Sequence, residues 1–339
     1  MLFSKNSQLI LRNSVMFETK KVFFTGNIKD NLPAYLLTYK TKINFQKYTD
    51  YINFQKQKNV KNIYIYNNFL VSKKIIQDCN TVVYYWPKSK DEAKFQVMNI
   101  ISCCTINTLI FIVGNNSCGV KSASLILKDW IDFKIIDKAR HSILIMGFLK
   151  KTVKFKIEDF FKIHTWKGFY IKSLPGVFGY KKIDEGSQLL ASTFSKNIKG
   201  KVLDIGSGTG FLSVCLLYFS PNIDLTLTDN SIVALKCSKE TLDINQLKAK
   251  IIISDVYSNI LEKFDLIVSN PPFHKDLKVN FNVAKKIILH AKNFLNKQGE
   301  LRFVTNNNNS CEILLRQNFK KYSLIEKNNK YKVYQAFLK

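Results

Sequence analysis

Residues 201–210 read Lys201-Val-Leu-Asp-Ile-Gly-Ser-Gly-Thr-Gly210, and an apolar run follows over 211–219. The first half of the quoted stretch is mostly apolar and predicts a buried strand, and the run after it predicts a helix. Between them, Gly206, Gly208 and Gly210 leave the backbone without side chains. Backbone N–H groups there can approach a ligand closely, and the helix presents its positive end to an anion. The stretch therefore predicts a nucleotide-cofactor site, without choosing the cofactor.

From this loop to the C-terminus, strand and helix signals alternate. We expect strands at 224–229, 250–255, 264–270 and 300–305, helices at 231–245 and 283–295, and a loop at 275–282. Strands that alternate with helices predict a parallel sheet with helical crossovers. The last two apolar runs, 322–326 and 332–338, flank Asn328-Asn329 and predict an antiparallel hairpin at one edge of that sheet.

The first half of the chain repeats this plan in a weaker form. Strands are expected at 22–26, 63–66, 81–87, 108–116 and 142–150, with a helix at 91–103. The order of these elements matches that of the second half, which favours a duplicated α/β domain. We therefore predict an α/β protein of two tandem Rossmann-like domains, residues 1–150 and 186–339, joined by a connecting segment at 151–185.

The composition indicates a polyanionic partner. The 339 residues carry 52 Lys and Arg against 25 Asp and Glu, a formal net charge of +27. Such a balance is typical of proteins that bind nucleic acid or an anionic membrane. The chain is also rich in Lys, Asn, Ile, Phe and Tyr, so part of the charge has an alternative origin in the bias of an A+T-rich genome.

The charge is densest in and around the connecting segment. Residues 150–182 hold nine lysines and two acidic residues, interleaved with Phe and Trp. Lysines among aromatics suit RNA phosphates and bases, and the candidate contacts are Lys151, Lys154 and Lys156. The same pattern also fits a linker with packed aromatics and solvated lysines. Residues 1–200 carry a net charge of +19 and the remainder +8, which predicts that the first domain and the connector bind the polyanion while the second domain does the chemistry.

The cysteines and the apolar runs exclude several classes of protein. None of the seven cysteines forms a Cys-x-x-Cys pair, so we expect neither a disulfide framework nor a zinc ribbon, and no metal site. The N-terminus has no signal-peptide core, and the longest apolar runs are far shorter than a membrane span. We therefore expect a cytoplasmic protein that does not contact a membrane.

Polar positions beyond the glycine loop bear on the cofactor. Asp229 ends the second strand of this half, and a carboxylate there can accept hydrogen bonds from both hydroxyls of a ribose. Asn230 follows it, and Asp204 lies near the end of the first strand. These residues leave NAD and S-adenosylmethionine both open.

The tetrapeptide Asn270-Pro271-Pro272-Phe273, at the end of the fourth strand, favours S-adenosylmethionine. A planar conjugated amine is a poor nucleophile because its lone pair is delocalised. The Asn270 side-chain oxygen and the Pro271 carbonyl can each accept one N–H of such an amine, which turns the lone pair toward an electrophile. The two prolines stiffen the loop, and Phe273 can stack on the ring that carries the amine. A dehydrogenase has no use for this arrangement.

The chain resembles the class I methyltransferases that modify exocyclic amines, and most closely the bacterial small-subunit ribosomal RNA guanine-N2 methyltransferases. The matching segments run almost from end to end: 84–99, 174–178, 186–190, 201–206, 269–274 and 331–334. The family has two tandem class I methyltransferase-like domains, of which only the second is catalytic. The resemblance implies S-adenosylmethionine as cofactor, and as substrate N2 of guanine 1207 in the 16S rRNA of the 30S subunit, with the enzyme a monomer.

The first half agrees with a degenerate copy, kept for fold support and RNA contact. Its glycine loop is reduced to Gly26, followed by Asn27-Ile28-Lys29, and its counterpart of the tetrapeptide is Tyr85-Trp86-Pro87-Lys88. No cofactor site can be argued from these residues.

The resemblance implies three groups of site residues, in the numbering of this chain. The catalytic residues are Asn270, Pro271 and Phe273. The cofactor-binding residues are Asp204, Gly206, Ser207, Gly208, Gly210, Asp229, Asn230, Asp255, Gly186 and Ser187. The substrate-binding residues are Asn270, Pro272, Phe273 and His274, to which the charge pattern of the connecting segment adds Lys151, Lys154 and Lys156. Among these, Asp255 is expected to read the adenine amino group, and His274 to contact the substrate or the loop rather than act as a base.

Three alternatives remain open on the sequence. Adenine-N6 and glutamine-amide methyltransferases use closely related tetrapeptides, so the tetrapeptide alone does not identify the substrate. The nearest rival is an enzyme that acts on guanine N2 in large-subunit ribosomal RNA. A rival from another class is an rRNA-binding assembly factor without activity, although the intact motifs of the second half speak against a loss of catalysis.

Overall fold

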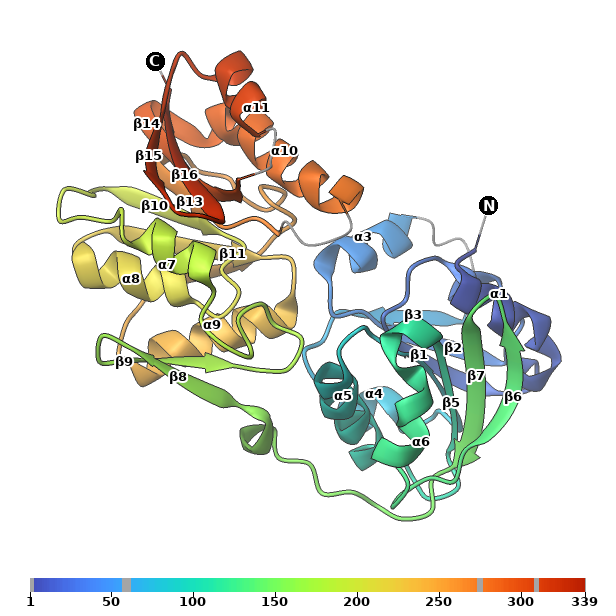
Figure 1. The fold of residues 1–339 in the computed structure, drawn as a ribbon. Helices are drawn as coiled ribbons and strands as arrows, with labels where there is room; N and C mark the ends of the chain where they lie inside the picture. The colour runs from blue at the N-terminus through green and yellow to red at the C-terminus, as the bar shows by residue number, and fades with distance from the viewer. Residues whose placement is uncertain (1–2, 57–61, 273–276, 308–310, 339) are drawn as a thin grey trace. The chain divides into compact units, whose positions relative to one another are not determined.

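The structure is a computed structural model that describes residues 3–56, 62–272, 277–307 and 311–338 (Figure 1). The chain divides into two compact units, Met1–Phe160 and Phe161–Lys339. The division lies inside the predicted connecting segment, and the larger part of that segment belongs to the second unit. Each unit is built around a seven-stranded sheet of its own.

The sheet of the second unit has the strand order β12-β11-β10-β13-β14-β16-β15. Strands β10 to β14 pair in parallel, and β16 runs antiparallel between β14 and β15. The predicted parallel sheet with an antiparallel hairpin at one edge is therefore confirmed. The strands are β10 (Lys201–Ile205), β11 (Asp224–Asp229), β12 (Lys250–Ile253), β13 (Phe264–Ser269), β14 (Leu295–Asn306), β15 (Lys321–Lys327) and β16 (Tyr331–Phe337).

Helices cover both faces of this sheet (Figure 1). They are α7 (Glu185–Ala191), α8 (Phe211–Phe219), α9 (Ile232–Ile244), α10 (Leu277–Phe294) and α11 (Cys311–Asn318). Apolar strand residues pack against α7, α8 and α9 in one core and against α10 and α11 in a second core. The loop expected at 275–282 is wrong from residue 277 onward, because α10 already begins at Leu277.

The sheet of the first unit has the order β3-β2-β1-β4-β5-β7-β6, which is the same order in its own numbering. This identity confirms the prediction of two tandem domains with one plan. The strands are β1 (Lys21–Gly26), β2 (Lys40–Asn44), β3 (Ile63–Tyr66), β4 (Thr81–Tyr85), β5 (Leu109–Asn115), β6 (Lys134–Ala139) and β7 (Ser142–Phe148). The α-helices are α1 (Lys5–Arg12), α2 (Leu32–Tyr35), α3 (Tyr48–Lys56), α4 (Lys73–Ile76), α5 (Lys90–Ser102) and α6 (Ala123–Ile126), with short 3₁₀ turns η1 (Ser14–Phe17), η2 (Asn116–Cys118), η3 (Val120–Ser122) and η4 (Ile157–Phe160).

The second strand of the first sheet departs from the sequence prediction. The sequence predicts it at 63–66, and this is wrong, because β2 lies between β1 and the strand formed by those residues. The polar residues Lys40, Thr41 and Lys42 at the start of β2 do not indicate a buried strand in the sequence. The Lys42 side chain is buried, and its ammonium donates a hydrogen bond to the Ile75 carbonyl oxygen at 2.7 Å. A lysine whose stem packs and whose ammonium finds an acceptor can occupy a core position that its polarity assigns to the surface.

The connecting segment contains a hairpin that belongs to the second unit, β8 (Lys162–Trp166) and β9 (Phe169–Ser173). Strand β9 is fixed on α9, since the backbone N–H of Lys172 donates to the Thr241 hydroxyl at 2.9 Å. The Trp166 ring packs edge-on against Phe211, with ring centroids 5.3 Å apart. Trp166 and Phe169 of the hairpin therefore contribute to the core of the second unit.

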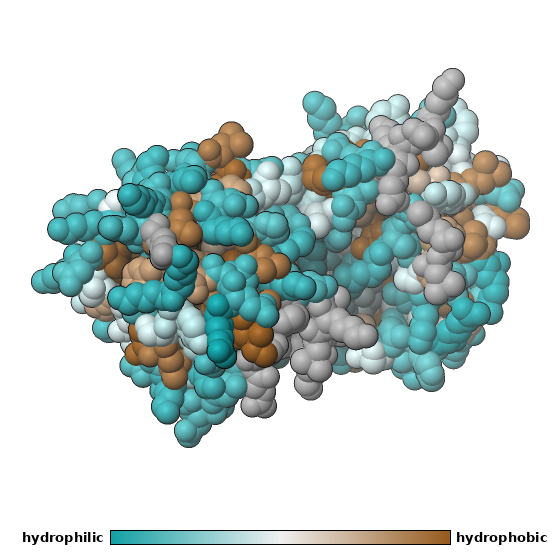
Figure 2. Space-filling model, turned by 90° about the horizontal axis from the view of Figure 1, so that it is seen from above, coloured by the Kyte–Doolittle hydropathy of each residue, from teal (hydrophilic) through white to brown (hydrophobic). Residues whose placement is uncertain are grey.

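The surface is basic on both units. Residues 1–160 carry 25 basic and 11 acidic side chains, and residues 161–339 carry 27 and 14, so the net charges are +14 and +13. The excess expected for the first domain and the connector together is not an excess of the first unit alone, because most of the connector belongs to the second unit. No helix in the described parts of the chain is long and apolar enough to cross a membrane. The face drawn in Figure 2 is mostly hydrophilic, with hydrophobic residues in small separate groups.

Candidate functional site

The glycine loop joins the end of β10 to the start of α8. Gly206, Gly208 and Gly210 have φ of +76°, +56° and +79°, a conformation that L side chains rarely adopt. At Gly210 an added Cβ would also lie 3.0 Å from the Ser238 Cα, so helix packing excludes a side chain there. At Gly206 an added Cβ would meet nothing within 4 Å, so the backbone of the loop faces open space at this point.

Asp229, at the end of β11, supports the loop from the side. One of its carboxylate oxygens accepts the backbone N–H of Gly208 at 3.0 Å, and the other accepts that of Ser231 at 2.8 Å. Ser231 in turn caps α9, its hydroxyl accepting the backbone N–H of Ala234. Asp229 therefore ties the glycine loop to the start of α9.

Asp204 lies beneath the loop and is fully buried. Its Oδ2 accepts the Ser213 hydroxyl at 2.7 Å, and its Oδ1 has no hydrogen-bond partner among the described residues. Burial, only partly offset by Ser213, raises the pKa of Asp204 to about 7. A buried carboxyl group with one unsatisfied oxygen needs either a proton or a donor from a ligand.

Asn270 follows β13 and is held by two acceptors. Its side-chain nitrogen donates to Asp184 Oδ2 and to Ser187 Oγ, both at 2.8 Å. Asp184 is also the N-cap of α7, where the same Oδ2 accepts the backbone N–H of Ser187 at 2.8 Å. Of the rest of the tetrapeptide, Pro271 is buried and Pro272 is exposed. Phe273 and the following His274 lie outside the described residues.

A pocket connects the glycine loop with Asn270 and contains several of the predicted residues. Among the predicted site residues, Ser187, Gly206, Ser207, Gly208 and Asn270 line it. Sequence analysis did not identify the other lining residues, which are Ile171, Phe178, Gly179, Ile183, Asp184, Thr209, Phe211 and Leu212. The signal that could have identified Asp184 is its residue type, since Asp is among the residues preferred at a helix N-cap. The loop of residues 174–184 lies over the glycine loop, with the Phe178 carbonyl 3.7 Å from a Cβ added at Gly208, and the pocket that remains measures about 30 Å³.

Other predicted residues lie around this pocket without lining it. Asp204, Gly210, Asp229 and Asn230 support the loop and the strand ends, and Pro271 and Pro272 follow Asn270. Gly186 packs against the Tyr331 ring, where an added Cβ would lie 3.0 Å from a ring carbon. Asp255 lies 3.1 Å from the Lys286 ammonium of α10. A ligand contact by Asp255 would therefore compete with an ion pair.

The same positions can be located in the first unit. Gly26 ends β1 as Gly206 follows β10, and with these two glycines superposed the ladders of the two sheets run in the same register. Three polar residues of the second unit are then replaced by aromatic residues that are at most 3% exposed. The replacements are Phe24 for Asp204, Phe45 for Asp229 and Tyr85 for Asn270.

The loop after β1 also takes a different course. In the second unit the backbone N–H groups of Gly206 and Ser207 donate to Thr228 of β11. In the first unit the N–H of Asn27 donates to the carbonyl of Tyr85, on the opposite neighbour of the central strand, at 2.8 Å. A Cβ on Gly26 would lie 2.3 Å from that carbonyl oxygen. The loop of the first unit therefore covers the strand end that carries Asn270 in the second.

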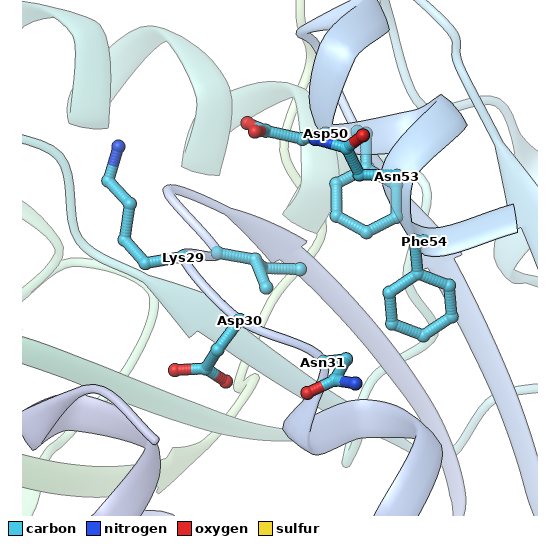
Figure 3. A pocket seen from close by; sticks show the side chains of 8 residues that line it. Lys29, Asp30, Asn31, Asp50, Asn53 and Phe54 are labelled. Carbon is cyan, nitrogen blue, oxygen red and sulfur yellow. The ribbon is translucent and has the colours of Figure 1, made fainter. Parts of the chain in front are cut away.

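A larger hollow of about 240 Å³ opens beside this loop in the first unit. Figure 3 shows Asp50 and Asn53 of α3 on one side and residues 29–31 on the other. Its floor includes Phe45 and Phe54, whose ring centroids are 5.4 Å apart. Burial raises the pKa of Asp50 above its ordinary value, against the opposing effect of Lys47 and Lys29. With Phe45 in the place of Asp229, the hollow has no carboxylate at the end of the second strand, and its acidic side chains, Asp30 and Asp50, come from the loop after β1 and from α3.

At the start of the connecting segment, three lysines lie on the surface, whereas two aromatic rings pack against the first unit. Lys151, Lys154 and Lys156 are exposed. Phe155 and Phe160 stack at 5.4 Å and both contact the ring of Phe95 in α5. Because these two rings pack against Phe95, the three lysines are the side chains of this stretch that can contact RNA phosphates.

Comparison with known families accounts for nearly the whole chain. The methyltransferase small domain model matches residues 168–335, and the model of its N-terminal domain matches residues 7–164. A curated relative named ribosomal RNA small subunit methyltransferase C, from Buchnera aphidicola subsp. Acyrthosiphon pisum, is 61% identical over 339 residues, which are 100% of both chains. The chain belongs to this methyltransferase C family.

More distant members of the methyltransferase C family align over the same length. The protein of that name from Escherichia coli (strain K12) is 37% identical over 336 residues, covering 99% of this chain and 97% of its own. Among solved structures, a T. thermophilus 16S rRNA N2 methyltransferase for guanine 1207, in complex with AdoMet and guanosine, matches with a TM-score of 0.82. At 17% sequence identity, covering 99% of this chain and 92% of that one, this match shows that the two share the whole two-domain fold.

Proposed function

We propose that the chain transfers a methyl group from S-adenosylmethionine to N2 of guanine 1207 in the 16S rRNA of the small ribosomal subunit. Membership of the methyltransferase C family supports the reaction type and the RNA. The T. thermophilus protein with the same fold carries the finer description of base and atom. Every residue assigned below to the chemistry comes from the second unit of one chain, which supports a monomer, and a ribosomal subunit as substrate implies the cytoplasm.

The observation that carries the proposal is the orientation of the Asn270 side chain. Both N–H groups of its amide are used by Asp184 and Ser187. Its oxygen is therefore the atom left to accept a hydrogen bond from a substrate. An exocyclic NH₂ group whose two hydrogens are held by Asn270 Oδ1 and the Pro271 carbonyl has its lone pair turned out of the plane of the ring, as attack on a methyl group requires.

The residues around the glycine loop fit the cofactor. The open backbone at Gly206 and the unsatisfied Oδ1 of Asp204 suit a ligand with hydroxyl and ammonium donors, and we assign Asp229, at the end of β11, to its ribose. When bound, S-adenosylmethionine supplies a methyl group on a sulfonium as the electrophile. The pocket of about 30 Å³ is smaller than this molecule, so we expect the part of the loop around Phe178 and Gly179 to move on entry, while Asp184 stays fixed at the start of α7.

The remaining assignments concern the substrate. We assign Phe273 to stacking on the guanine and Pro272 and His274 to contacts with it, while water takes the proton that the methylated amine releases. Lys151, Lys154 and Lys156 are assigned to rRNA phosphates, and the first unit to fold support and RNA contact. The basic charge on both units supports binding of a polyanion.

The test is methyl transfer from labelled S-adenosylmethionine to small-subunit RNA and to assembled subunits that lack the modification. Nuclease digestion and mass spectrometry then identify the methylated nucleoside. We expect N2-methylguanosine at position 1207 with the wild-type chain and none with Asn270→Ala. The matched control is Asn296→Ala, which removes an exposed amide bonded to Asp265 at the start of β13 and should leave transfer unchanged.

Each other outcome overturns part of the proposal. Methylation of large-subunit RNA in place of small-subunit RNA would move the substrate. Another methylated base would keep the cofactor and change the acceptor. Tight RNA binding without any transfer would favour the assembly factor.

A further inference from the structure

We infer that Asp184 and Ser187 are positioning residues that select which end of the Asn270 amide faces the substrate, an inference that rests on the proposed function. The sequence pattern draws attention to Asn270 itself, but a primary amide has two nearly isosteric ends. Only the oxygen end can accept the N–H of an amine, and the nitrogen end in its place would present hydrogens to hydrogens. The catalytic value of Asn270 therefore depends on what fixes its rotation.

The hydrogen bonds of the amide leave one orientation. A carboxylate accepts and does not donate, so the group that faces Asp184 Oδ2 at 2.8 Å must be the amide nitrogen. The second hydrogen of that nitrogen reaches Ser187 Oγ, also at 2.8 Å. Rotation of the amide by half a turn would place its oxygen against the carboxylate oxygen. The oxygen of Asn270 is consequently directed away from α7.

The two acceptors are themselves fixed by the start of α7. Asp184 caps the helix, and the same Oδ2 accepts the backbone N–H of Ser187, so the two acceptors are tied to one another. Glu185, between them, lies 2.8 Å from the ammonium of Lys182 and 2.8 Å from that of Lys330. These contacts bind the first turn of α7 to the hairpin of β15 and β16, so the amide is held by a rigid element.

The first unit contains the same construction without the carboxylate. Helix α1 is capped by Ser4, whose hydroxyl accepts the backbone N–H of Ser7 at 3.2 Å. The Ser7 hydroxyl lies 3.0 Å from the hydroxyl of Tyr85, the counterpart of Asn270 in register. The serine that reaches from the helix to the strand end is thus present in both units. A phenol has a single polar atom and no orientation to select, and the unit that carries it has Ser4 in the place of Asp184.

The experiment measures single-turnover methyl transfer by the full chain at saturating S-adenosylmethionine, on whichever RNA the wild type methylates. We expect Asp184→Ala to lower the rate about 10- to 100-fold, with the affinity for S-adenosylmethionine unchanged within twofold, and Ser187→Ala to lower the rate about 3- to 10-fold. Asp184→Asn should restore the rate to within about threefold of the wild type, because its amide oxygen can accept from both Asn270 and Ser187. The matched control is Ser7→Ala, which removes the equivalent hydroxyl in the first unit and should not change the rate.

A second measurement does not depend on activity. In the ¹⁵N-labelled chain, the side-chain NH₂ signal of Asn270 is identified by its disappearance in Asn270→Ala. Asp184→Ala should move this signal and accelerate the exchange of its protons, and Asp184→Asn should do so less. If Asp184→Ala does not fold, Ser187→Ala replaces it in this measurement. That variant keeps Asp184, and therefore keeps the hydrogen bond from the backbone N–H of residue 187 that caps α7.

Three results would overturn the inference: a rate unaffected by Asp184→Ala, an Asp184→Asn variant as slow as Asp184→Ala, or an Asn270 amide signal unchanged by both substitutions. A wild-type chain that transfers no methyl group would instead overturn the proposed function, and the amide signal would still report on Asp184.

Discussion

The two units share strand order and ladder register, yet they differ in kind at the three positions where a ligand would be held. In the second unit these are Asp204, Asp229 and Asn270, and in the first they are buried aromatic rings. Burial of a ring of this size contributes roughly 1.5–3 kcal/mol to folding. A buried carboxylate such as Asp204 works in the opposite direction.

The difference shows which stabilising contacts a fold gives up in order to keep a binding site. The edge of the second sheet keeps a buried carboxyl oxygen that needs a proton or a ligand donor, and a glycine backbone that is open to a ligand. The first unit closes the same edge with Phe24, Phe45 and Tyr85 and bends its loop over the strand end. The fold is thus independent of the site, and the site is a set of polar residues that the fold tolerates.

The largest effect is expected when the second unit is given the residue of the first at position 270. Asn270→Tyr removes the oriented amide and adds a ring to the pocket, and it should lower methyl transfer by about 10³-fold or more. The measurement is single-turnover transfer with saturating cofactor. The control, Tyr85→Phe, changes the first unit at the equivalent position and should leave transfer unchanged, and activity of Asn270→Tyr within tenfold of the wild type would contradict the assignment.

The next effect concerns Asp229, the last residue of β11. Asp229→Phe copies Phe45 and removes charge-assisted hydrogen bonds worth about 1.5–3 kcal/mol each, so S-adenosylmethionine should bind about 100-fold more weakly or not at all. Titration calorimetry should give one cofactor per wild-type chain and no binding by the first unit. Phe45→Leu is the control. A stoichiometry of two would mean that the hollow beside Phe45 is a second cofactor site.

The pH dependence of stability should separate the two units through Asp204. Its pKa of about 7 in the folded chain exceeds the ordinary value of 3.8, so the stability this group contributes is present below pH 3.8 and is lost as the pH rises through 7. Between pH 5 and pH 8 the wild type should lose about 2–3 kcal/mol relative to Asp204→Asn. The midpoint of thermal unfolding of the second unit at the two pH values is the measurement, and an equal shift in both proteins would refute the raised pKa.

The smallest effect concerns the connecting segment. Replacement of Lys151, Lys154 and Lys156 by Ala should weaken RNA binding and reduce the slope of log affinity against log salt by about one unit for each phosphate that the variant no longer neutralises. The matched control replaces the exposed Lys121, Lys128 and Lys134 of the same unit. Equal slopes for the two triple variants would mean that the segment is an ordinary solvated face.

The sequence predicts the structure correctly where a residue pattern is compatible with only one local structure. The apolar strand ending in three glycines predicts β10 and the start of α8, and the ends of β11 and β13 carry Asp229 and Asn270 as expected. The sequence prediction failed at β2, because a lysine with a buried ammonium looks like a surface residue. It also missed Asp184, because the partner of Asn270 lies 86 residues earlier in the chain and only the packing of α7 brings it near.

The loop of residues 174–184 has a kinetic consequence. We expect a cofactor held against the glycine loop to enter when the part of this segment around Phe178 and Gly179 is displaced, and the association rate would then follow the opening rate rather than diffusion. Spent cofactor would leave by the same route, so opening of this segment would set an upper limit on turnover however fast the transfer step becomes.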